Sequence, residues 1–436
     1  MYLDAINKKL ALGEIDDPAL FPHLKQLQET PWTFEISFGL DLLPETAGIL
    51  LIRGARQYGK STWLEQELRQ TIKQWGPGTA FYLNGDSIPS EASLEEAIQN
   101  LLPLFSKNAH VKRIFIDEIT AIPRWEIALK RLADEGRLSE TLLITTGSKA
   151  TDLRRGVEKL PGRKGKLSRS AYIFTPLSYS EFHRVCGKTL GEETWLSYLL
   201  SGGSPIACSE LASYGFIPEY VIELVRDWVE GEVASSGRSR TALLNIMITL
   251  FRLGGSPIGQ SKLAREAGLA NNTVAQGYLE ILQDLGCLTP SYPWDPHRKI
   301  LILRKPCKYH FTNVLVALAY HPGRIRSPQD FLKLPESQQA MWYEWLVAQE
   351  IQRRKAIAGQ EMLAPLAFWQ NDKHEIDFVT GLESFIEVKR GGASPIEFAW
   401  FPHQMPGKHL TVINTKSFET PYIQGITLEK FLLKSV

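Results

Sequence analysis

One short segment restricts the possible folds of this chain more than any other. Residues 54–61 read Gly-Ala-Arg-Gln-Tyr-Gly-Lys-Ser, which fits the pattern G-x-x-x-x-G-K-[ST]. The apolar run GILLIRG at 48–54 predicts a buried strand before this loop, and STWLEQELRQTIKQW predicts a helix after it. Backbone N–H groups of such a loop surround phosphate oxygens, the lysine reaches the β- and γ-phosphates, and the serine hydroxyl ligates Mg²⁺. The sequence therefore predicts a nucleotide site with Ser61 as a magnesium ligand, formed by Gly54, Ala55, Arg56, Gln57, Tyr58, Gly59, Lys60, Ser61 and Thr62.

A second motif follows on a later apolar segment, RIFIDE at 113–118. Its two acids come directly after the strand-like residues. We expect Asp117 to hold Mg²⁺ through water and Glu118 to polarise the attacking water. A strand that ends in two solvated carboxylates is the plainer alternative, and the loop at 54–61 argues against it.

Two further features are typical of hydrolysis sites. The strand-like segment TLLITTGS at 141–148 ends in polar residues, and Ser148, or else Thr146, could orient the attacking water; a helix cap at the strand end is the alternative. A basic stretch follows, in which Arg163 is the first candidate for an arginine offered to the γ-phosphate of a neighbouring subunit. Such a role requires a homo-oligomer. A solvated basic loop or a DNA-backbone contact is the alternative for most of these residues.

The order of predicted elements indicates the fold class. Apolar strands alternate with helical patterns up to about residue 175, which predicts an α/β unit with a parallel sheet covered on both faces. Beyond it the pattern changes to helices broken by glycine, and past residue 325 to a helix followed by strand-like runs. We expect five regions: an N-terminal lead-in (1–40), a P-loop NTPase core (41–175), a helical lid (176–240), a winged-helix domain (241–325) and a C-terminal α/β domain (326–436).

The winged-helix prediction rests on residues 256–288, which have a helix-turn-helix rhythm with a turn at Gly268 and a cap at Asn271 or Asn272. The second helix carries no Lys or Arg, whereas readers of base edges usually have a basic surround. This region could bind DNA or could pack between the neighbouring domains, and the sequence does not decide between these two roles. The basic residues of the candidate wing are Arg298, Lys299, Arg304, Lys305 and Lys308.

Composition limits the other classes of function. The formal net charge is +1, so any nucleic-acid surface must be local. The four cysteines are far apart and match no metal-ligand spacing, which favours a reducing compartment. The N-terminal segment lacks an apolar core, and no apolar run approaches the roughly 20 residues of a membrane helix. The sequence therefore predicts a soluble, cytoplasmic protein.

Several of these segments together resemble a known family. GARQYGKST, IFIDE, LLITTGSKATDL, FTPLSYSEF at 174–182, GGSP at 202–205 and KYHFTNVLVA at 308–317 are similar to prokaryotic AAA-type ATPases that carry a C-terminal restriction-endonuclease-like domain. The resemblance implies that the nucleotide is ATP, that Mg²⁺ is its cofactor, and that the last region has a nuclease-like fold. The residues KGK after Arg163 look like an insertion, which weakens the transfer of a finger role to that arginine.

The last region contains a spacing that looks like the PD-(D/E)xK nuclease core. Asp377 lies in HEIDFVT, and Glu387 and Lys389 lie in SFIEVKR, which gives D-x₉-E-x-K. A turn near Gly381 would pair the two strands and bring Asp377 towards Glu387, while Glu387 and Lys389 share one strand face. Two carboxylates would then bind Mg²⁺, and the lysine would steady the attacking water. Glu344, or with a weaker claim Glu350, could complete the metal site.

Two functions follow from these expectations. The first is an ATPase whose nucleotide state controls a nuclease domain that acts on DNA, with Glu118, Asp377, Glu387 and Lys389 as catalytic residues. The second is an ATP-dependent switch or scaffold whose endonuclease-like domain binds nucleic acid or protein without cleaving it.

Overall fold

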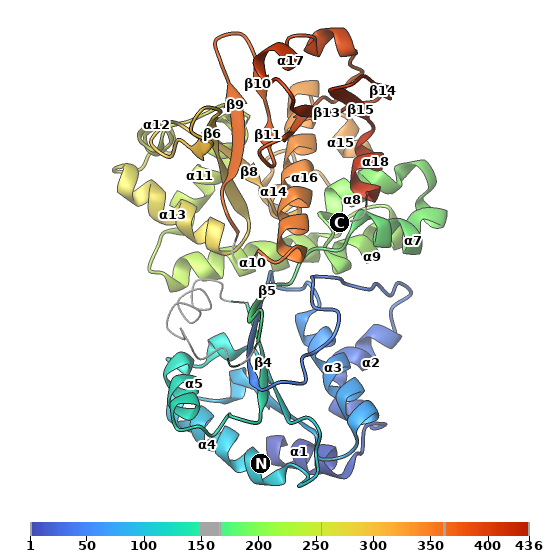
Figure 1. Cartoon of the computed structure of the whole chain (residues 1–436), viewed down its shortest axis with the longest axis vertical. Coiled ribbons are helices and arrows are strands. Elements are labelled where there is room, and N and C mark those ends of the chain that lie inside the picture. The colour runs from blue at the N-terminus through green and yellow to red at the C-terminus, as the bar shows by residue number, and fades with distance from the viewer. Residues whose placement is uncertain (1, 149–164, 166, 254, 361–362, 435–436) are drawn as a thin grey trace. The chain divides into compact units, whose positions relative to one another are not determined.

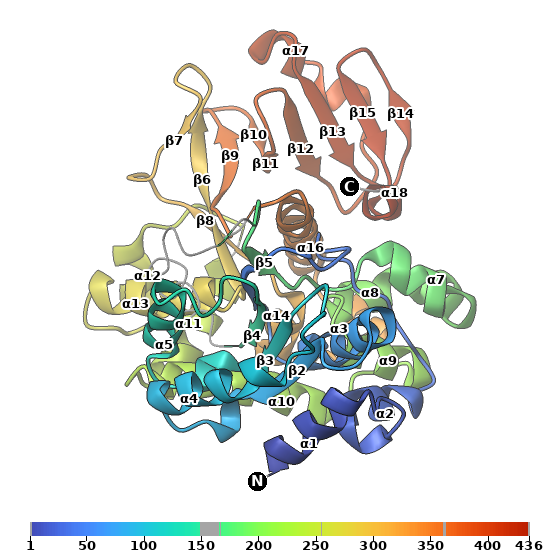
Figure 2. The same cartoon turned by 60° about the horizontal axis from the view of Figure 1, so that its bottom comes forward.

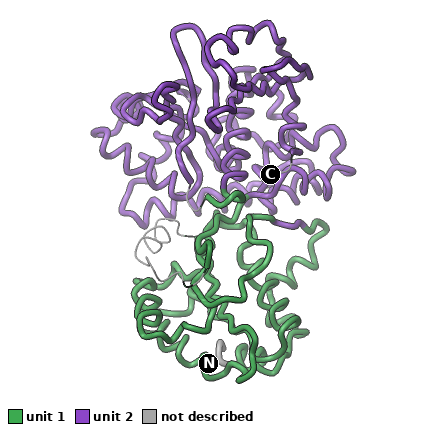
Figure 3. Tube along the Cα trace, viewed as in Figure 1, with its two compact units in different colours: residues 1–33, 37–175, 356–361 green, residues 34–36, 176–355, 362–436 purple. Residues whose placement is uncertain are grey.

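The computed structural model describes residues 2–148, 165, 167–253, 255–360 and 363–434. The chain folds into two compact units (Figure 3). Unit 1 comprises residues 1–33, 37–175 and 356–361, and unit 2 comprises residues 34–36, 176–355 and 362–436.

Unit 1 alternates helices and strands, as the sequence predicts. Its elements are α1 (Tyr2–Leu12), α2 (Pro22–Gln28), β1 (Gly48–Arg53), α3 (Lys60–Trp75), β2 (Ala80–Asn84), α4 (Glu91–Leu101), β3 (Arg113–Asp117), α5 (Trp125–Asp134), β4 (Leu142–Gly147) and β5 (Ala171–Ile173).

The strands of unit 1 form one sheet in the order β2-β3-β4-β1-β5, and every neighbouring pair is parallel. The predicted parallel sheet is confirmed. Its strands are buried on both faces, which explains why they read as continuous apolar runs. The short strand β5 was not predicted, because three residues carry too little pattern to reveal a strand.

Alternate residues of these strands build the core on one face of the sheet. Side chains such as Phe81, Ile114 and Leu143 pack in one cluster with Leu94 of α4 and Trp125 of α5. Helix α3 lies on the opposite side of the sheet from α4 and α5 (Figures 1 and 2). The sheet therefore lies between two layers of helices. Because all its strands are parallel, their carboxyl-terminal ends lie on the same side of the unit.

The N-terminal segment is an integral part of unit 1, and α1 follows the edge strand β2. Asn7 is 3% exposed, and its amide exchanges two hydrogen bonds with the backbone of Tyr82, each 2.8 Å long. Leu10 on the same helix is fully buried. Helix α1 thus covers a strand edge that would otherwise present unpaired backbone groups.

Unit 2 holds the remaining elements. Its helices are α7 (Tyr179–Leu190), α8 (Thr194–Ser201), α9 (Pro205–Tyr214), α10 (Glu219–Ser235), α11 (Arg240–Leu253), α12 (Gln260–Glu266), α13 (Asn272–Asp284), α14 (Val314–Tyr320), α15 (Pro328–Leu332), α16 (Glu336–Ile357), α17 (Phe401–Gln404) and α18 (Leu428–Leu433). Its strands are β6 (Leu288–Asp295), β7 (Ile300–Leu301), β8 (Lys308–Phe311), β9 (Leu366–Gln370), β10 (Glu375–Ile376), β11 (Phe378–Val379), β12 (Ser384–Val388), β13 (His409–Ile413), β14 (Phe418–Glu419) and β15 (Ile423–Ile426).

Two sheets organise these strands. The first has the order β10-β9-β6-β7, with β8 also paired to β6, and the second has the order β11-β12-β13-β15-β14. In the first sheet β6 runs parallel to β9, with Ser291 opposite Leu366. Strands from the predicted winged-helix region and from the predicted C-terminal domain therefore share one sheet.

Helices α12 and α13 occupy the two helical segments of the predicted helix-turn-helix, whereas strand β6 was not predicted. Asn271 caps α13, because its side chain accepts from the N–H of Val274 at 2.9 Å, and Gly268 has the left-handed φ of 66° expected at the turn. Strands β7 and β8 both pair antiparallel with β6. The assignment to a winged-helix fold stays a prediction. No helix in the described part of the chain is both long and apolar enough to cross a membrane.

Candidate functional site

The loop between β1 and α3 has the backbone of an anion-binding turn. Gln57 has a φ of 62° and Gly59 a φ of 94°, so two residues of this short loop are left-handed. Gly59 is the N-cap of α3 and provides no side-chain acceptor, so no cap hydrogen bond covers the start of this helix. A Cβ at Gly54 would lie 2.7 Å from the carbonyl oxygen of Phe174, so this position requires glycine. The loop therefore leaves the positive end of the α3 dipole accessible to a phosphate group.

Lys60 lies within this loop. Its side chain is 5% exposed, and Nζ donates to the carbonyl oxygens of Gly54 at 3.0 Å and Ala55 at 2.9 Å. Burial lowers the pKa of Lys60, although the charges of Glu118 and Asp117 oppose this shift. The ammonium group is thus held by carbonyls of the loop.

Asp117 ends β3 and is fixed by its neighbours at the strand ends. The hydroxyl of Thr146, at the end of β4, donates to Asp117 Oδ1. The N–H of Glu118 lies 3.1 Å from the same oxygen and also 3.1 Å from Thr146 Oγ1. Asp117 is 6% exposed, and Thr146 is fully buried. The adjacent parallel strands β3 and β4 therefore hold the Asp117 carboxylate in a fixed orientation at the carboxyl-terminal end of the sheet.

Glu118 is held in an unusual conformation beside Ser148. Its φ of 47° is left-handed, which is uncommon for a residue with a side chain. Its Oε2 accepts from the N–H of Ser148 at 3.0 Å and from the hydroxyl of Ser148 at 2.9 Å. Arg56 Nε donates to the same hydroxyl at 3.4 Å. Of the two polar residues suggested at the end of β4, Ser148 thus contacts Glu118 and Thr146 contacts Asp117.

Gly85 belongs to this site, although the sequence analysis did not single it out. It follows β2, and a Cβ here would collide with the carbonyl oxygen of Glu118. Only glycine allows the backbone of β2 to approach the strained Glu118 this closely. A glycine after a parallel strand is the one signal that could have indicated it.

The other predicted residues of the loop lie in mixed environments. Tyr58 is 3% exposed, whereas Arg56 and Gln57 are exposed. Ser61 and Thr62 are partly buried in the first turn of α3. Arg163 lies outside the described residues, and its finger role stays a prediction.

The donor set suits Mg²⁺ bound together with a nucleotide. The predicted protein ligands are a hydroxyl and a carboxylate, and Mg²⁺ prefers one or two such oxygens with phosphates and water over an all-protein cage. Within the described ranges, no group of three or more His, Cys, Asp or Glu residues is arranged to hold a metal ion.

The C-terminal residues also come together, within unit 2. The segment HEIDFVT, which we expected to be one strand, divides at Asp377 into β10 and β11 because β10 pairs with β9 and β11 pairs with β12. Asp377 therefore lies where the chain passes from one sheet to the other. The Asp377 N–H donates to Glu387 Oε2 at 3.3 Å, and Asp377 Oδ2 accepts from the N–H of Val388 at 2.9 Å. Lys389 Nζ lies 2.6 Å from Glu387 Oε1, as expected for two residues on one strand face.

A lysine from the predicted wing completes this cluster and corrects an expectation. Lys308 on β8 is 1% exposed, forms an ion pair with Glu375, and lies 3.5 Å from Asp377 Oδ1. Burial opposes its charge, but Asp377, Glu344 and Glu375 outweigh burial and raise its pKa. Lys308 therefore cannot contact DNA as a wing residue, whereas Arg298, Lys299, Arg304 and Lys305 are exposed.

The carboxyl groups around this lysine have shifted pKa values. Burial and the charge of Asp377 raise the pKa of Glu387 to about 8, against the opposing effect of Lys389. Burial and Asp377 also raise the pKa of Glu344, on α16, well above its usual range. The predicted position of Glu344 beside Asp377 and Glu387 agrees with this mutual influence.

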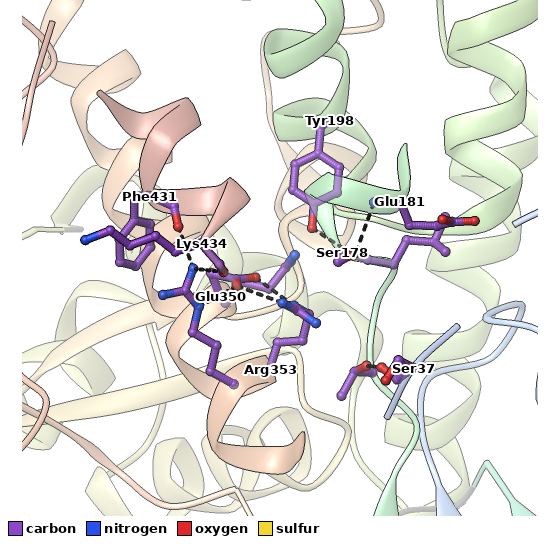
Figure 4. A network of polar contacts seen from close by, with 12 residues as sticks. Ser37, Ser178, Glu181, Tyr198, Glu350, Arg353, Phe431 and Lys434 are labelled. Carbon is purple, nitrogen blue, oxygen red and sulfur yellow. Dashed lines mark hydrogen bonds and ion pairs between the residues drawn. The ribbon is translucent and has the colours of Figure 1, made fainter. Parts of the chain in front are cut away.

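Glu350 has a different environment from Glu344, although both lie on α16. It is 2% exposed and accepts from Arg353 at 2.7 and 2.9 Å and from Arg354 at 2.7 Å (Figure 4). Arg354 also donates to the carbonyl oxygens of Phe431 and, at 3.3 Å, Lys434. Glu350 thus pairs with two arginines, of which Arg354 also connects α16 to α18, so its weaker claim as a metal ligand is not supported.

Comparison with protein families finds a match for the region around the first site. Residues 46–183 match the family model of the AAA domain. The matched stretch includes the loop at 54–61 together with Asp117, Glu118 and Ser148. A comparison with curated proteins finds no match.

The chain is also similar to several solved structures. A Walker-type ATPase of Pyrococcus abyssi is 13% identical, over 69% of this chain and 93% of its own, with a TM-score of 0.42. The Aeropyrum pernix ORC1 protein in complex with DNA is 15% identical, over 73% and 91%, with a TM-score of 0.33. AMPPCP-bound DnaA from Aquifex aeolicus is 11% identical, over 61% and 87%, with a TM-score of 0.27.

Proposed function

We propose that unit 1 binds ATP with Mg²⁺ and hydrolyses it. The observation that carries this proposal is the meeting of an uncapped α3 N-terminus, the buried Lys60 and the paired acids Asp117 and Glu118 at one edge of a parallel sheet. The match of residues 46–183 to the AAA domain supports it.

The residues of this edge have distinct roles in the proposal. The loop N–H groups and the α3 dipole hold the phosphates, and Lys60 exchanges the carbonyls of Gly54 and Ala55 for phosphate oxygens. Ser61 and Asp117 would hold Mg²⁺, which would neutralise charge on the phosphates. Glu118 orients the attacking water, and Ser148 fixes the Glu118 carboxylate through two hydrogen bonds.

Two variants test this assignment. Lys60→Ala should abolish nucleotide binding, because the phosphates lose their only buried cation in the described part of the loop. Glu118→Gln should keep binding and lose hydrolysis, so that ATP stays bound. Equilibrium binding of a fluorescent ATP analogue and steady-state phosphate release measure the two effects. Unchanged hydrolysis in both variants would refute the site.

For the C-terminal region we propose the second of the two predicted roles, a domain that binds nucleic acid or protein without cleaving it. The supporting observation is that each carboxylate oxygen of Asp377 and Glu387 already contacts a donor from the chain itself. Linear and single-stranded DNA incubated with the protein, ATP and Mg²⁺ or Mn²⁺ should stay intact. Cleavage that Asp377→Ala removes would establish the nuclease role instead.

A further inference from the structure

Lys308 carries a buried ammonium group in unit 2. Strand β8 pairs antiparallel with β6, and this register places Lys308 opposite Ser291 in the interior of unit 2. The Lys308 side chain is 1% exposed, and its Nζ lies 5.4 Å from the ring centroid of Phe368. A lysine is almost never buried to this degree unless acids surround it. Here Glu375 and Asp377 supply the opposing charge.

The four carboxylate oxygens of Asp377 and Glu387 are all in contact with donors. Two of these donors are backbone N–H groups, one from Val388 and one from Asp377 itself. The other two are the ammonium groups of Lys308, at 3.5 Å from Asp377 Oδ1, and Lys389, at 2.6 Å from Glu387 Oε1. A divalent cation shared by these two acids would have to displace a lysine from at least one of them.

Two lysines already lie among the acids of this cluster. Three carboxylates, those of Glu375, Asp377 and Glu387, are in contact with two ammonium groups. A fourth acid, Glu344, acts electrostatically on Lys308, Asp377 and Glu387. A metal ion would bring two further positive charges close to both lysines, in a place where burial reduces screening by water. The contacts that Lys308 and Lys389 make with the acids, and not the sum of the charges, are thus the reason why the residues present do not fit the Mg²⁺ ion that the nuclease-like spacing implies.

We infer that Lys308 is a built-in cation that takes the place of a divalent metal ion at the Asp377–Glu387 cluster. It balances the acids where the two sheets of unit 2 meet, and the cluster binds no Mg²⁺ or Mn²⁺ while Lys308 is present. This inference extends the non-cleaving role proposed above and is independent of ATP hydrolysis by unit 1.

Removal of the lysine charge tests the inference. Mn²⁺ binding to the nucleotide-free full chain is measured by electron paramagnetic resonance, and binding at the cluster is the part that Asp377→Asn removes. We expect no such part in the wild-type protein. Lys308→Met keeps the length of the side chain and removes its charge. It should create one Mn²⁺ site whose affinity is at least about tenfold above the weakest binding that the measurement can detect at the cluster of the wild type. That site should disappear in the double variant with Asp377→Asn.

Lys305→Met is the matched control, since Lys305 lies on the same segment and is exposed. It should leave Mn²⁺ binding at the wild-type level. A wild-type protein that binds Mn²⁺ through Asp377 would overturn the inference, and so would a Lys308→Met protein that folds and gains no site.

Loss of Lys308 leaves acids without a partner and can prevent folding. Circular dichroism with and without Mn²⁺ then decides, because restoration of the fold by Mn²⁺ supports the inference. If the variant stays unfolded in both conditions, the comparison of Mn²⁺ binding between wild type and Asp377→Asn decides alone, and equal binding supports the inference. A wild-type protein that binds Mn²⁺ at the cluster but leaves DNA intact would reject the built-in cation and keep the non-cleaving role.

Discussion

Thr146 sets the orientation of Asp117, because its hydroxyl donates to the carboxylate from the neighbouring strand end. Thr146→Val keeps the shape of the side chain and removes this donor. We expect kcat for ATP hydrolysis to fall about tenfold, since an acid that holds Mg²⁺ through water depends on its orientation. The free energy of unfolding should fall by about 1 kcal/mol. Steady-state ATPase kinetics and urea unfolding measure these effects.

Thr145→Val is the control for this experiment. Thr145 is equally buried, but its hydroxyl donates to the carbonyl oxygen of Leu50 at 3.0 Å and not to the site. A similar loss of stability with an unchanged kcat is expected. Equal losses of kcat in both variants would contradict a specific role for Thr146.

His23 gives unit 1 a pH-dependent contribution to stability. Its Nδ1 lies 2.6 Å from Glu65 Oε1, and the hydrogen bond to Glu65 raises the pKa of His23 above its usual 6.5 despite partial burial. A raised pKa means that the charged form is stabilised in the folded state. The contribution is therefore complete below about pH 6.5 and is lost as the pH rises through the folded-state pKa.

The stability difference between wild type and His23→Gln should accordingly shrink as the pH rises above neutrality. Urea unfolding between about pH 5.5 and 8.5 measures it. In a Glu65→Gln background the same comparison should show no such dependence. A difference that stays constant with pH in the wild-type background would exclude the ion pair as its source.

Residues that act through a local string could be predicted from the sequence, and residues that act through distant contacts could not. The loop at 54–61 and the acids Asp117 and Glu118 can be recognised from the residues next to them in the sequence. Gly85 matters because it approaches Glu118, and Lys308 because it reaches Asp377, 69 positions further along the sequence. The residues next to Lys308 do not indicate its contact, and Gly85 is marked only by its place after a strand.

At the scale of elements, α1 should stabilise the sheet through Asn7. Asn7→Ala removes both hydrogen bonds to the backbone of Tyr82 at the edge of β2. Water can replace part of this pairing, so we expect the free energy of unfolding to fall by about 1–2 kcal/mol. The amide proton of Tyr82 should also exchange faster. Hydrogen exchange followed by NMR or mass spectrometry measures this local opening.

Lys8→Ala provides the comparison, since Lys8 is exposed on the same helix. It should leave both stability and exchange at Tyr82 nearly unchanged. If Lys8→Ala and Asn7→Ala behaved alike, the effect would come from the helix as a whole and not from the amide contacts.

The strands of unit 1 could be predicted because burial on both faces gives them unbroken apolar runs. The same reasoning failed in unit 2 for HEIDFVT, where polar and apolar residues alternate as in one half-buried strand. The break at Asp377 arises because the two halves pair with different partners, β9 and β12. A choice of partner is a property of the tertiary structure, and a local pattern does not contain it.

At the scale of the whole molecule, the two units should respond differently to nucleotide. If only unit 1 binds ATP, a non-hydrolysable ATP analogue with Mg²⁺ stabilises that unit by mass action, by about 2.7 kcal/mol at a concentration 100 times Kd. Differential scanning calorimetry should show two transitions, of which one shifts upward. Lys60→Ala should abolish the shift. A single transition, or an equal shift of both, would contradict separate stabilities.

The parallel pairing of β6 with β9 has a consequence for how this chain can be cut and recombined. A break placed between residues 325 and 326 would separate two strands of one sheet and expose the edge of β6. The C-terminal region is therefore not an independent domain that can be exchanged between related chains at that point. A chimaera that keeps the fold must take residues 288–311 and the segment from 363 onward from the same parent chain. We therefore expect these two parts to be inherited together.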